Sequence, residues 1–137
     1  MKKRFYFDTS IWLDFLEERN ESTLPKSYWA KELVKKITLK GDEIIFSDNN
    51  MIELVQLGYS EFEIEEIFER INTIIRVEAT EKQLGMAKDL GLKRKIPKRD
   101  ALHALIARDN HAILITLDHD FKKLIDIIKP YRTNALL

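Results

Sequence analysis

Short apolar runs alternate along the chain with longer segments in which apolar residues recur at helical spacing. The apolar runs are rich in β-branched and aromatic residues and stop at turn or polar residues, which is typical of buried strands. We expect four such strands, at about 4–8, 43–47, 74–78 and 112–117. The intervening segments predict helices over 9–19, 26–40, 47–58, 60–71, 80–91, 96–109 and 121–127.

Residues with known capping preferences mark several of these helix boundaries. Thr9 or Ser10 can cap the first helix, because a side-chain oxygen accepts from the free N–H groups of the first turn. Ser47 or Asp48 can do the same for the third helix. Gly91 is the expected end of the fifth helix, since glycine readily leaves the helical conformation.

Strands that alternate with helices predict a parallel sheet that is covered on both faces. We therefore expect an α/β fold, a three-layer α/β/α domain with a central parallel sheet of four to five strands. The first and fourth strands should be central neighbours in the order 3-2-1-4, and residues 130–137 can add a fifth strand at the far edge. A single domain over residues 1–137 is expected from the length.

Composition narrows the class of protein. The 137 residues are 45% hydrophobic and 34% charged, the balance of a folded domain, and 23 basic residues match 23 acidic ones. The chain has no cysteine, which excludes disulfides, thiolate metal sites and a cysteine nucleophile. No apolar run approaches the roughly 20 residues that span a bilayer, and the N-terminal run stops at Asp8, too early for a signal peptide. We expect a cytoplasmic protein with no membrane partner.

Two of the predicted strands end on carboxylates. Asp8 follows the first strand and Asp118 follows the fourth, and ligands bind outside the carboxyl ends of the strands in open parallel sheets. Asp100 lies near the start of the helix that leads into the fourth strand, and this helix start could lie at either end of the sheet. Glu53 lies on the helix that leaves the second strand. The spacing predicts an acidic pocket at this edge of the sheet.

Such a pocket needs a cation or protons to neutralise it. At about 4 Å, two carboxylates repel by roughly 4 kcal/mol at an effective dielectric near 20. An all-oxygen site suits Mg²⁺ or Mn²⁺, which can activate water for attack on phosphorus. Metal-assisted hydrolysis is the chemistry that this set of residues favours.

Each of these acids also has a structural interpretation. Asp8 can cap the helix that follows it, Asp100 can interact with a helix dipole, and Glu53 can be an ordinary solvated residue. Of Asp118 and Asp120, one can be functional while the other caps the last helix. The histidines lack the spacing of metal ligands, which favours surface or helix-packing roles for His103, His111 and His119.

Three segments together resemble the PIN-domain family of nucleases. They are "FYFDTSIWLDFLE" at the start, "MIELVQLG" around Glu53, and "KRDALHALIARDNHAILITLDHDF" near the end. The last is the most specific, with an aspartate that opens an alanine-rich helix, an apolar strand and then Thr-x-Asp-x-Asp-Phe. The resemblance spans nearly the whole chain in order and spacing.

The resemblance implies a Mg²⁺- or Mn²⁺-dependent ribonuclease that cleaves single-stranded RNA. The acidic positions of the family fall on Asp8, Glu53, Asp100 and Asp118. Asp8, Asp100 and Asp118 would be metal ligands, Ser10 and Thr116 would support them through their hydroxyls, and Asp120 is either an auxiliary acid or a structural residue. Small members are often VapC-type toxins, which form homodimers and are silenced by a cognate antitoxin protein.

A departure from the toxin pattern lies just before Asp100. Many such toxins have small or apolar residues there, where this chain has Lys98 and Arg99. A nuclease of RNA processing outside toxin systems is therefore a second interpretation. The basic run could bind flanking RNA phosphates or be a solvated loop between two helices; it comprises Lys93, Arg94, Lys95, Lys98 and Arg99.

Two other classes of protein remain as alternatives. The first is a PIN fold without catalysis that acts as a binding or scaffold module, although its acidic positions would then be free to change. The second is a phosphoryl-transfer domain, which usually has a second aspartate two residues after the first, where this chain has Ser10.

Large apolar side chains on the helices suggest how the domain could assemble. Trp12 and Trp29 occupy helical positions typical of a core. We expect surplus apolar surface around them and around Phe15, Tyr28 and Phe62, which would favour a symmetric homodimer.

Overall fold

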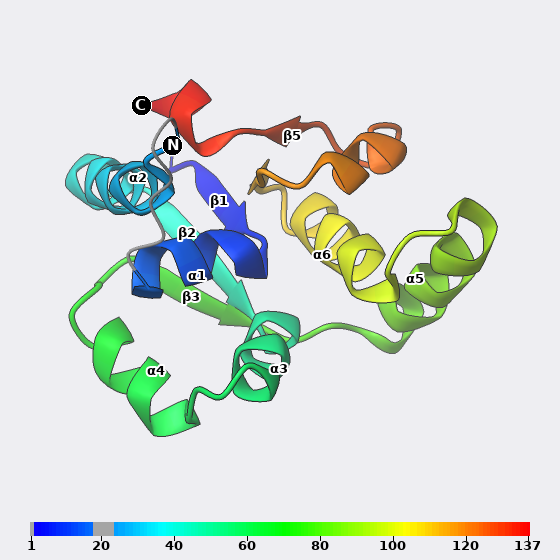
Figure 1. The fold of residues 1–137 in the computed structure, drawn as a ribbon, viewed down its shortest axis with the longest axis horizontal. Coiled ribbons are helices and arrows are strands. Elements are labelled where there is room, and N and C mark those ends of the chain that lie inside the picture. The colour runs from blue at the N-terminus through cyan, green and yellow to red at the C-terminus, as the bar shows by residue number, and fades with distance from the viewer. Residues whose placement is uncertain (1, 18–23) are drawn as a thin grey trace.

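A five-stranded parallel sheet forms the centre of the computed structural model, which describes residues 2–17 and 24–137 (Figure 1). The strands are β1 (Arg4–Phe7), β2 (Glu43–Ser47), β3 (Ile74–Val77), β4 (Ile113–Ile115) and β5 (Pro130–Tyr131). Their order is β3-β2-β1-β4-β5, and every neighbouring pair is parallel. The predicted order is confirmed, with a fifth strand at the edge beside β4, but of the expected segment 130–137 only Pro130–Tyr131 is a strand and Thr133–Leu136 is a 3₁₀ helix.

Helices connect the strands. They are α1 (Thr9–Glu17), α2 (Lys26–Lys40), α3 (Asp48–Gln56), α4 (Glu61–Phe68), α5 (Glu81–Arg94) and α6 (Lys98–Asp109), followed by the 3₁₀ helices η1 (His119–Leu124) and η2 (Thr133–Leu136). Each predicted helix is present, but the last one, expected over 121–127, is a 3₁₀ helix that begins and ends earlier. Residues 18 and 19 of the first predicted helix lie outside the described residues.

The two faces of the sheet carry separate cores. Successive side chains of a strand point to opposite faces, and Phe5 and Phe7 share a core with residues of α1, α2 and α4. Tyr6, between them, belongs to a second core with residues of α5 and α6. In Figure 1 these two groups of helices lie on opposite sides of the sheet. The three-layer α/β/α fold is therefore confirmed.

The register of the central strands brings two predicted site segments together. Phe7 at the end of β1 pairs with Ile115 at the end of β4. The N–H of Asp8 then donates to the carbonyl oxygen of Ile115 at 3.1 Å. Asp8 and Thr116, the residues that follow these two strand ends, consequently start from neighbouring positions.

Trp12 is a core residue and adds nothing to the surface. It is fully buried, and its ring centroid lies 5.0 to 5.6 Å from those of three phenylalanines in the core. The expected apolar surface around Trp12 is therefore wrong, because α1 turns this face toward the sheet. Phe15 and Trp29 are half-buried, whereas Tyr28 is 58% and Phe62 is 71% exposed.

The sequence pattern predicted that helix α5 ends at Gly91, and this prediction is wrong. The helix continues to Arg94, and Lys95 takes the left-handed conformation with φ of 54°. Gly91 instead lies where the chain returns against α5. A Cβ atom there would meet the carbonyl oxygen of Ile96 at 3.2 Å and the Cα of Lys98 at 3.4 Å. Glycine at this position suits close approach of the backbone rather than a helix end, because any side chain would press on the returning chain.

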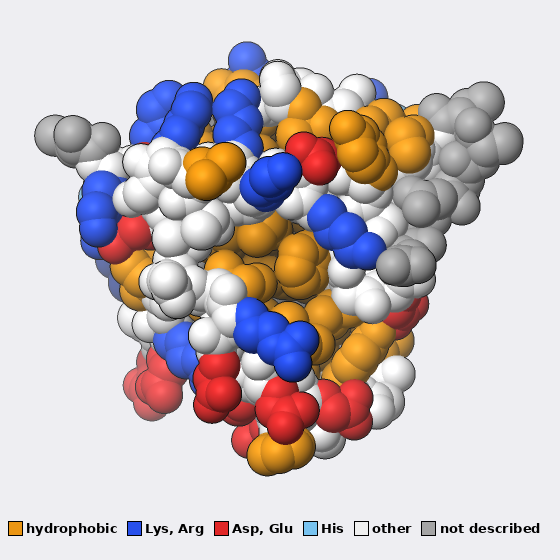
Figure 2. All heavy atoms as spheres, turned by 90° about the vertical axis from the view of Figure 1, so that its left-hand side faces the viewer, with side chains coloured by type: hydrophobic (Ala, Val, Ile, Leu, Met, Phe, Trp, Pro, Cys, Tyr) orange, Lys and Arg blue, Asp and Glu red, His pale blue; other side chains and the backbone are white. Residues whose placement is uncertain are grey.

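The face covered by α1, α2 and α4 is hollowed and divided by charge. Figure 2 shows hydrophobic side chains in a central hollow, with basic side chains above it and acidic ones below. The lower rim follows α4, which carries Glu61, Glu63, Glu65 and Glu66, all exposed.

Among the described residues, no helix is both long and apolar enough to cross a membrane.

Candidate active site

Asp8 lies where β1 ends and α1 begins, and its side chain accepts hydrogen bonds from α1 and from the residue after β4. Its Oδ2 accepts a hydrogen bond from the Thr116 hydroxyl at 2.6 Å. Its Oδ1 accepts from the Ser10 hydroxyl at 2.7 Å and from the N–H of Ile11 at 3.2 Å. Asp8, and not Thr9 or Ser10, therefore caps α1. The carboxylate is only 4% exposed and is held in one orientation from both sides.

Three further aspartates meet beside this strand end. Asp100 occupies the first turn of α6, while Asp118 and Asp120 follow β4. Each offers a carboxylate oxygen within 4.8 Å of the others. Asp118 also caps η1, since its side chain accepts from the N–H of Asp120 at 2.9 Å. Asp118 is therefore the residue that caps the last helix, while it also belongs to the group of three aspartates.

A hollow of about 220 Å³ brings four of the predicted acids together. The acids that line it are Asp8, Glu53, Asp100 and Asp118. In the described part of the chain, Asp8 lies outside the close group of three aspartates, and both of its oxygens already accept hydrogen bonds. The structure therefore places four of the predicted acids in one hollow, while the closest group of carboxylates in the described residues is Asp100, Asp118 and Asp120.

The carboxylates are crowded enough to change their protonation. The pKa of Asp100 rises to about 7, chiefly because the side chain is partly buried and also because Asp118, Asp8 and Glu53 are negatively charged. Burial also raises the pKa of Asp8, even though hydrogen bonds from Thr116 and Ser10 lower it. The metal-free pocket thus holds more negative charge than its surroundings compensate.

These donors fit a hard divalent cation. Carboxylate oxygens are the ligands that Mg²⁺ and Mn²⁺ prefer, and the described residues of the pocket offer no sulfur ligand. Asp100, Asp118 and Asp120 could hold such an ion, with Asp8 beside them. Its charge would offset the repulsion that raises the pKa of Asp100.

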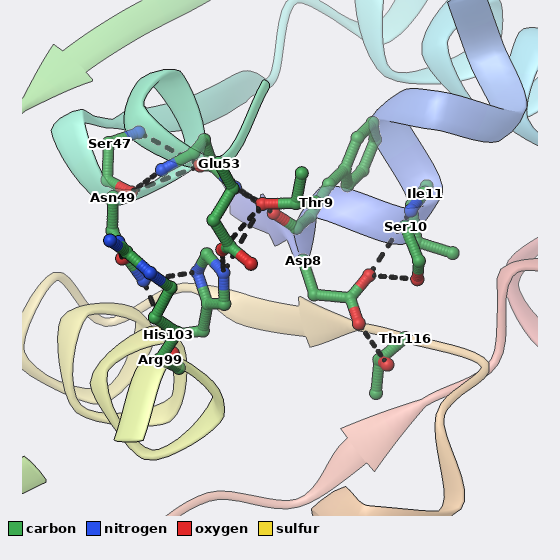
Figure 3. A network of polar contacts seen from close by, with 12 residues as sticks. Asp8, Thr9, Ser10, Ile11, Ser47, Asn49, Glu53, Arg99, His103 and Thr116 are labelled. Carbon is green, nitrogen blue, oxygen red and sulfur yellow. Dashed lines mark hydrogen bonds and ion pairs between the residues drawn. The ribbon is translucent and has the colours of Figure 1, made fainter. Parts of the chain in front are cut away.

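Glu53 enters the pocket from α3 and is tied to a histidine that the sequence interpretation placed elsewhere. The Oε1 atom of Glu53 accepts from the Thr9 hydroxyl at 2.9 Å and contacts Nε2 of His103 (Figure 3). Of the two roles expected for His103, the surface one is wrong, because the residue is buried on α6 against Glu53 and Asn49 of α3 and belongs to the polar network. Its position three residues after Asp100 on α6 could have revealed it, because residues at this spacing share a helix face.

The basic run divides between two helix ends. Lys93 and Arg94 lie in the last turn of α5, while Lys98 and Arg99 lie in the first turn of α6. It is therefore not a plain loop between helices. Arg94 pairs with both carboxylate oxygens of Asp126, at 2.6 and 2.9 Å.

Arg99 likewise has a protein partner, since its guanidinium donates to Oδ1 of Asn49 at 3.0 Å. Neither Lys98 nor Arg99 is among the residues that line the acidic hollow. The basic run thus lies next to Asp100 in sequence but outside the wall of the pocket.

Comparison with known proteins gives one family and several similar structures. The family model described as PIN domain matches residues 5–126. A toxin–antitoxin complex from Klebsiella pneumoniae shares 17% identity at a TM-score of 0.62, over 94% of this chain and 97% of that one. VapBC2 from Rickettsia felis, bound to a DNA fragment from its promoter, shares 18% identity at 0.64, over 94% and 98%. FitAcB from Neisseria gonorrhoeae shares 13% identity at 0.57, over 94% and 97%. No curated protein sequence matches the chain.

Proposed function

The chain belongs to the PIN domain family, and on this premise we propose that it is a Mg²⁺- or Mn²⁺-dependent endoribonuclease that cleaves single-stranded RNA. The observation that carries the proposal is the convergence of Asp8, Glu53, Asp100 and Asp118 on one hollow at the carboxyl ends of β1 and β4. A fold that served only as a scaffold would gain nothing from this costly concentration of negative charge.

The residues of the pocket would have different roles in hydrolysis. A bound divalent ion would supply activation of water and neutralisation of charge on the phosphodiester. Asp100, Asp118 and Asp120 would hold the ion, and the Asp8 carboxylate, fixed in one orientation, would lie beside it. Ser10 and Thr116 keep the Asp8 carboxylate from rotating. We assign Glu53, which also lines the hollow, to the orientation of water.

Basic residues beside the pocket support an RNA substrate. Lys93, Lys95 and Lys98 surround the junction of α5 and α6, next in sequence to Asp100. We assign these lysines to contacts with flanking phosphates. Arg94 and Arg99 would join them when their hydrogen bonds to Asp126 and Asn49 are exchanged for contacts with phosphate. Electrostatic contacts of this kind weaken as the salt concentration rises.

The direct test is cleavage of a labelled single-stranded RNA by the wild-type protein. We expect cleavage in Mg²⁺ or Mn²⁺ and none in EDTA, with restoration when metal is added back. Equal cleavage in EDTA would overturn the metal mechanism. Absence of cleavage with either metal, together with no stabilisation by metal, would favour the scaffold alternative.

A second proposal concerns the biological setting, the toxin of a toxin–antitoxin pair. Two of the similar structures are described as a toxin–antitoxin complex and a VapBC complex, which supports a protein partner for this chain. The apolar hollow of Figure 2 and the exposed Tyr28 and Phe62 offer surface for an antitoxin or for a homodimer. Expression of the chain alone should then arrest growth, and co-expression of the product of an adjacent gene should relieve it. Growth that continues during expression of an active nuclease would favour a role in RNA processing.

A further inference from the structure

His103 is a buried side chain that joins the acidic pocket to a second set of polar groups (Figure 3). It is 1% exposed. Its Nε2 faces Oε1 of Glu53 and lies 3.3 Å from the Thr9 hydroxyl. Its Nδ1 faces the Tyr6 hydroxyl and lies 3.2 Å from Nδ2 of Asn49. A neutral imidazole has one donor and one acceptor nitrogen, so these neighbours decide which nitrogen carries the proton.

The orientation of the Asn49 amide follows from Arg99. A guanidinium only donates, and Nη1 of Arg99 lies 3.0 Å from one amide atom of Asn49. That atom must therefore be the acceptor Oδ1. The amide nitrogen then points the other way, where it donates to the carbonyl oxygen of Arg99 at 3.2 Å and to His103. The hydrogen-bond network thus assigns the amide without ambiguity.

The assignment of Asn49 determines the tautomer of His103. An amide N–H can only donate, so Nδ1 of His103 accepts and the ring proton resides on Nε2. Glu53 agrees with this assignment, because an ionised carboxylate only accepts and its Oε1 atom faces Nε2. The N–H of Nε2 then donates to Glu53.

Glu53 receives both of its donors on one oxygen. The Thr9 hydroxyl and Nε2 of His103 both meet Oε1. Among the contacts of the described residues, this leaves Oε2 available to water or substrate in the hollow that Glu53 lines. The carboxylate is consequently held in one orientation.

We propose that His103 is a positioning residue of the active site, whose Nε2–H tautomer, imposed by Arg99 through Asn49, directs one oxygen of Glu53 into the pocket. The role of Glu53 in RNA cleavage rests on the proposed function. The assignment gives Arg99 a role other than phosphate binding. Its guanidinium donates to Asn49 and so orients the amide that faces His103. Partners of this kind around a metal site typically change activity by about 10–100-fold when they are removed.

Two matched substitutions separate positioning from packing. In His103→Gln the amide nitrogen can take the place of Nε2 and donate to Glu53, whereas in His103→Asn the shorter side chain reaches only the Nδ1 position. We expect His103→Asn to lower kcat for RNA cleavage by about 10–100-fold with little change in KM, because His103 is buried at the wall of the hollow and both of its ring nitrogens face protein groups. His103→Gln should recover most of the loss. His111→Asn is the control, since His111 is exposed, lies outside the pocket and has a φ of 54° that asparagine tolerates.

A measurement without RNA tests the tautomer itself. A long-range ¹H–¹⁵N spectrum of the metal-free wild-type protein should show the proton of His103 on Nε2, and Asn49→Asp should change that pattern because a carboxylate accepts from Nδ1. A proton on Nδ1 in the wild type would overturn the proposal, as would a folded His103→Asn variant with wild-type kcat. Equal loss in folded His103→Gln and His103→Asn would overturn it as well. A wild-type protein that cleaves no RNA would overturn the nuclease function and the catalytic use of Glu53, while the spectrum would still decide the tautomer.

Discussion

The hydroxyl of Thr116 donates a hydrogen bond to Oδ2 of Asp8 across 2.6 Å, although the two residues are 108 positions apart in the sequence. Each directly follows a strand, and the pairing of β1 with β4 brings them together. The bond is buried, and it orients a carboxylate that also caps α1. Fold and proposed chemistry therefore depend on the same contact.

Removal of the Thr116 hydroxyl should cost stability and activity together. Thr116→Val keeps the shape of the side chain but leaves a buried carboxylate with one donor fewer, which should lower the free energy of unfolding by about 1.5–3 kcal/mol. Chemical denaturation measures this change. Thr116→Ser keeps the hydroxyl and is the matched control. Equal stability of the valine variant and the wild type would show that the bond contributes nothing net.

Removal of single charges should separate the acids by role. Asp8→Asn and Asp100→Asn preserve size and should reduce metal-dependent RNA cleavage by about 100-fold or more while the circular dichroism spectrum stays that of a folded protein. Asp118→Asn should reduce cleavage more than Asp120→Asn, because Asp118 both lines the hollow and caps η1. Undiminished cleavage by Asp8→Asn would contradict the assignment of the site.

Divalent metal should stabilise the fold. A ligand that binds only the native state contributes about 2.7 kcal/mol at 100 times its Kd. Melting curves in EDTA, Mg²⁺ and Mn²⁺ should therefore shift upward with metal concentration. Asp100→Asn should lose most of this shift, and Asp109→Asn, at the other end of α6, should keep it. A wild-type melting temperature that is unchanged by either metal would contradict a cation site.

The metal-free protein should lose stability as the pH rises from about 4 to about 7. The pKa of Asp100 is raised from 3.8 to about 7, so the folded state retains a proton in this range that the unfolded state has released. The stabilising contribution is complete below the unfolded pKa and disappears as the pH passes the folded one. Denaturation in EDTA at several pH values checks this. Asp100→Asn should flatten the profile, and a wild-type profile as flat as that of the variant would refute the raised pKa.

Lysines near the pocket should contribute to RNA affinity through charge alone. Each phosphate contact that is lost should reduce the salt dependence of binding to single-stranded RNA, with the slope falling by about 0.7. Lys98→Gln is the test, measured in EDTA over a range of salt concentrations so that binding is separated from cleavage. Lys35→Gln on α2 is the control, because it is exposed and lies in the opposite layer. An unchanged slope for Lys98→Gln would favour a merely solvated residue.

Periodicity alone determined the order of strands and helices and the location of the acids. A strand that is apolar on both faces, such as Phe5 to Phe7, must be covered on both sides, and parallel strands place their carboxyl ends at one edge. From these two rules it follows that Asp8 and Asp118 lie at the same edge of the sheet. The segments 9–19 and 96–109 needed only local helical spacing to be recognised.

Tertiary packing decided the partners of the individual side chains. The sequence marks Gly91 as a helix end, but only the return of the chain against α5 shows that it is needed for close approach. In the sequence His103 is an ordinary helical position, and only the packing of α3 against α6 places it between Glu53 and Asn49. Arg99 looks like part of a basic patch until it meets Asn49. Local pattern encodes which face of an element is buried, whereas contacts between residues about fifty positions apart exist only once the layers have packed.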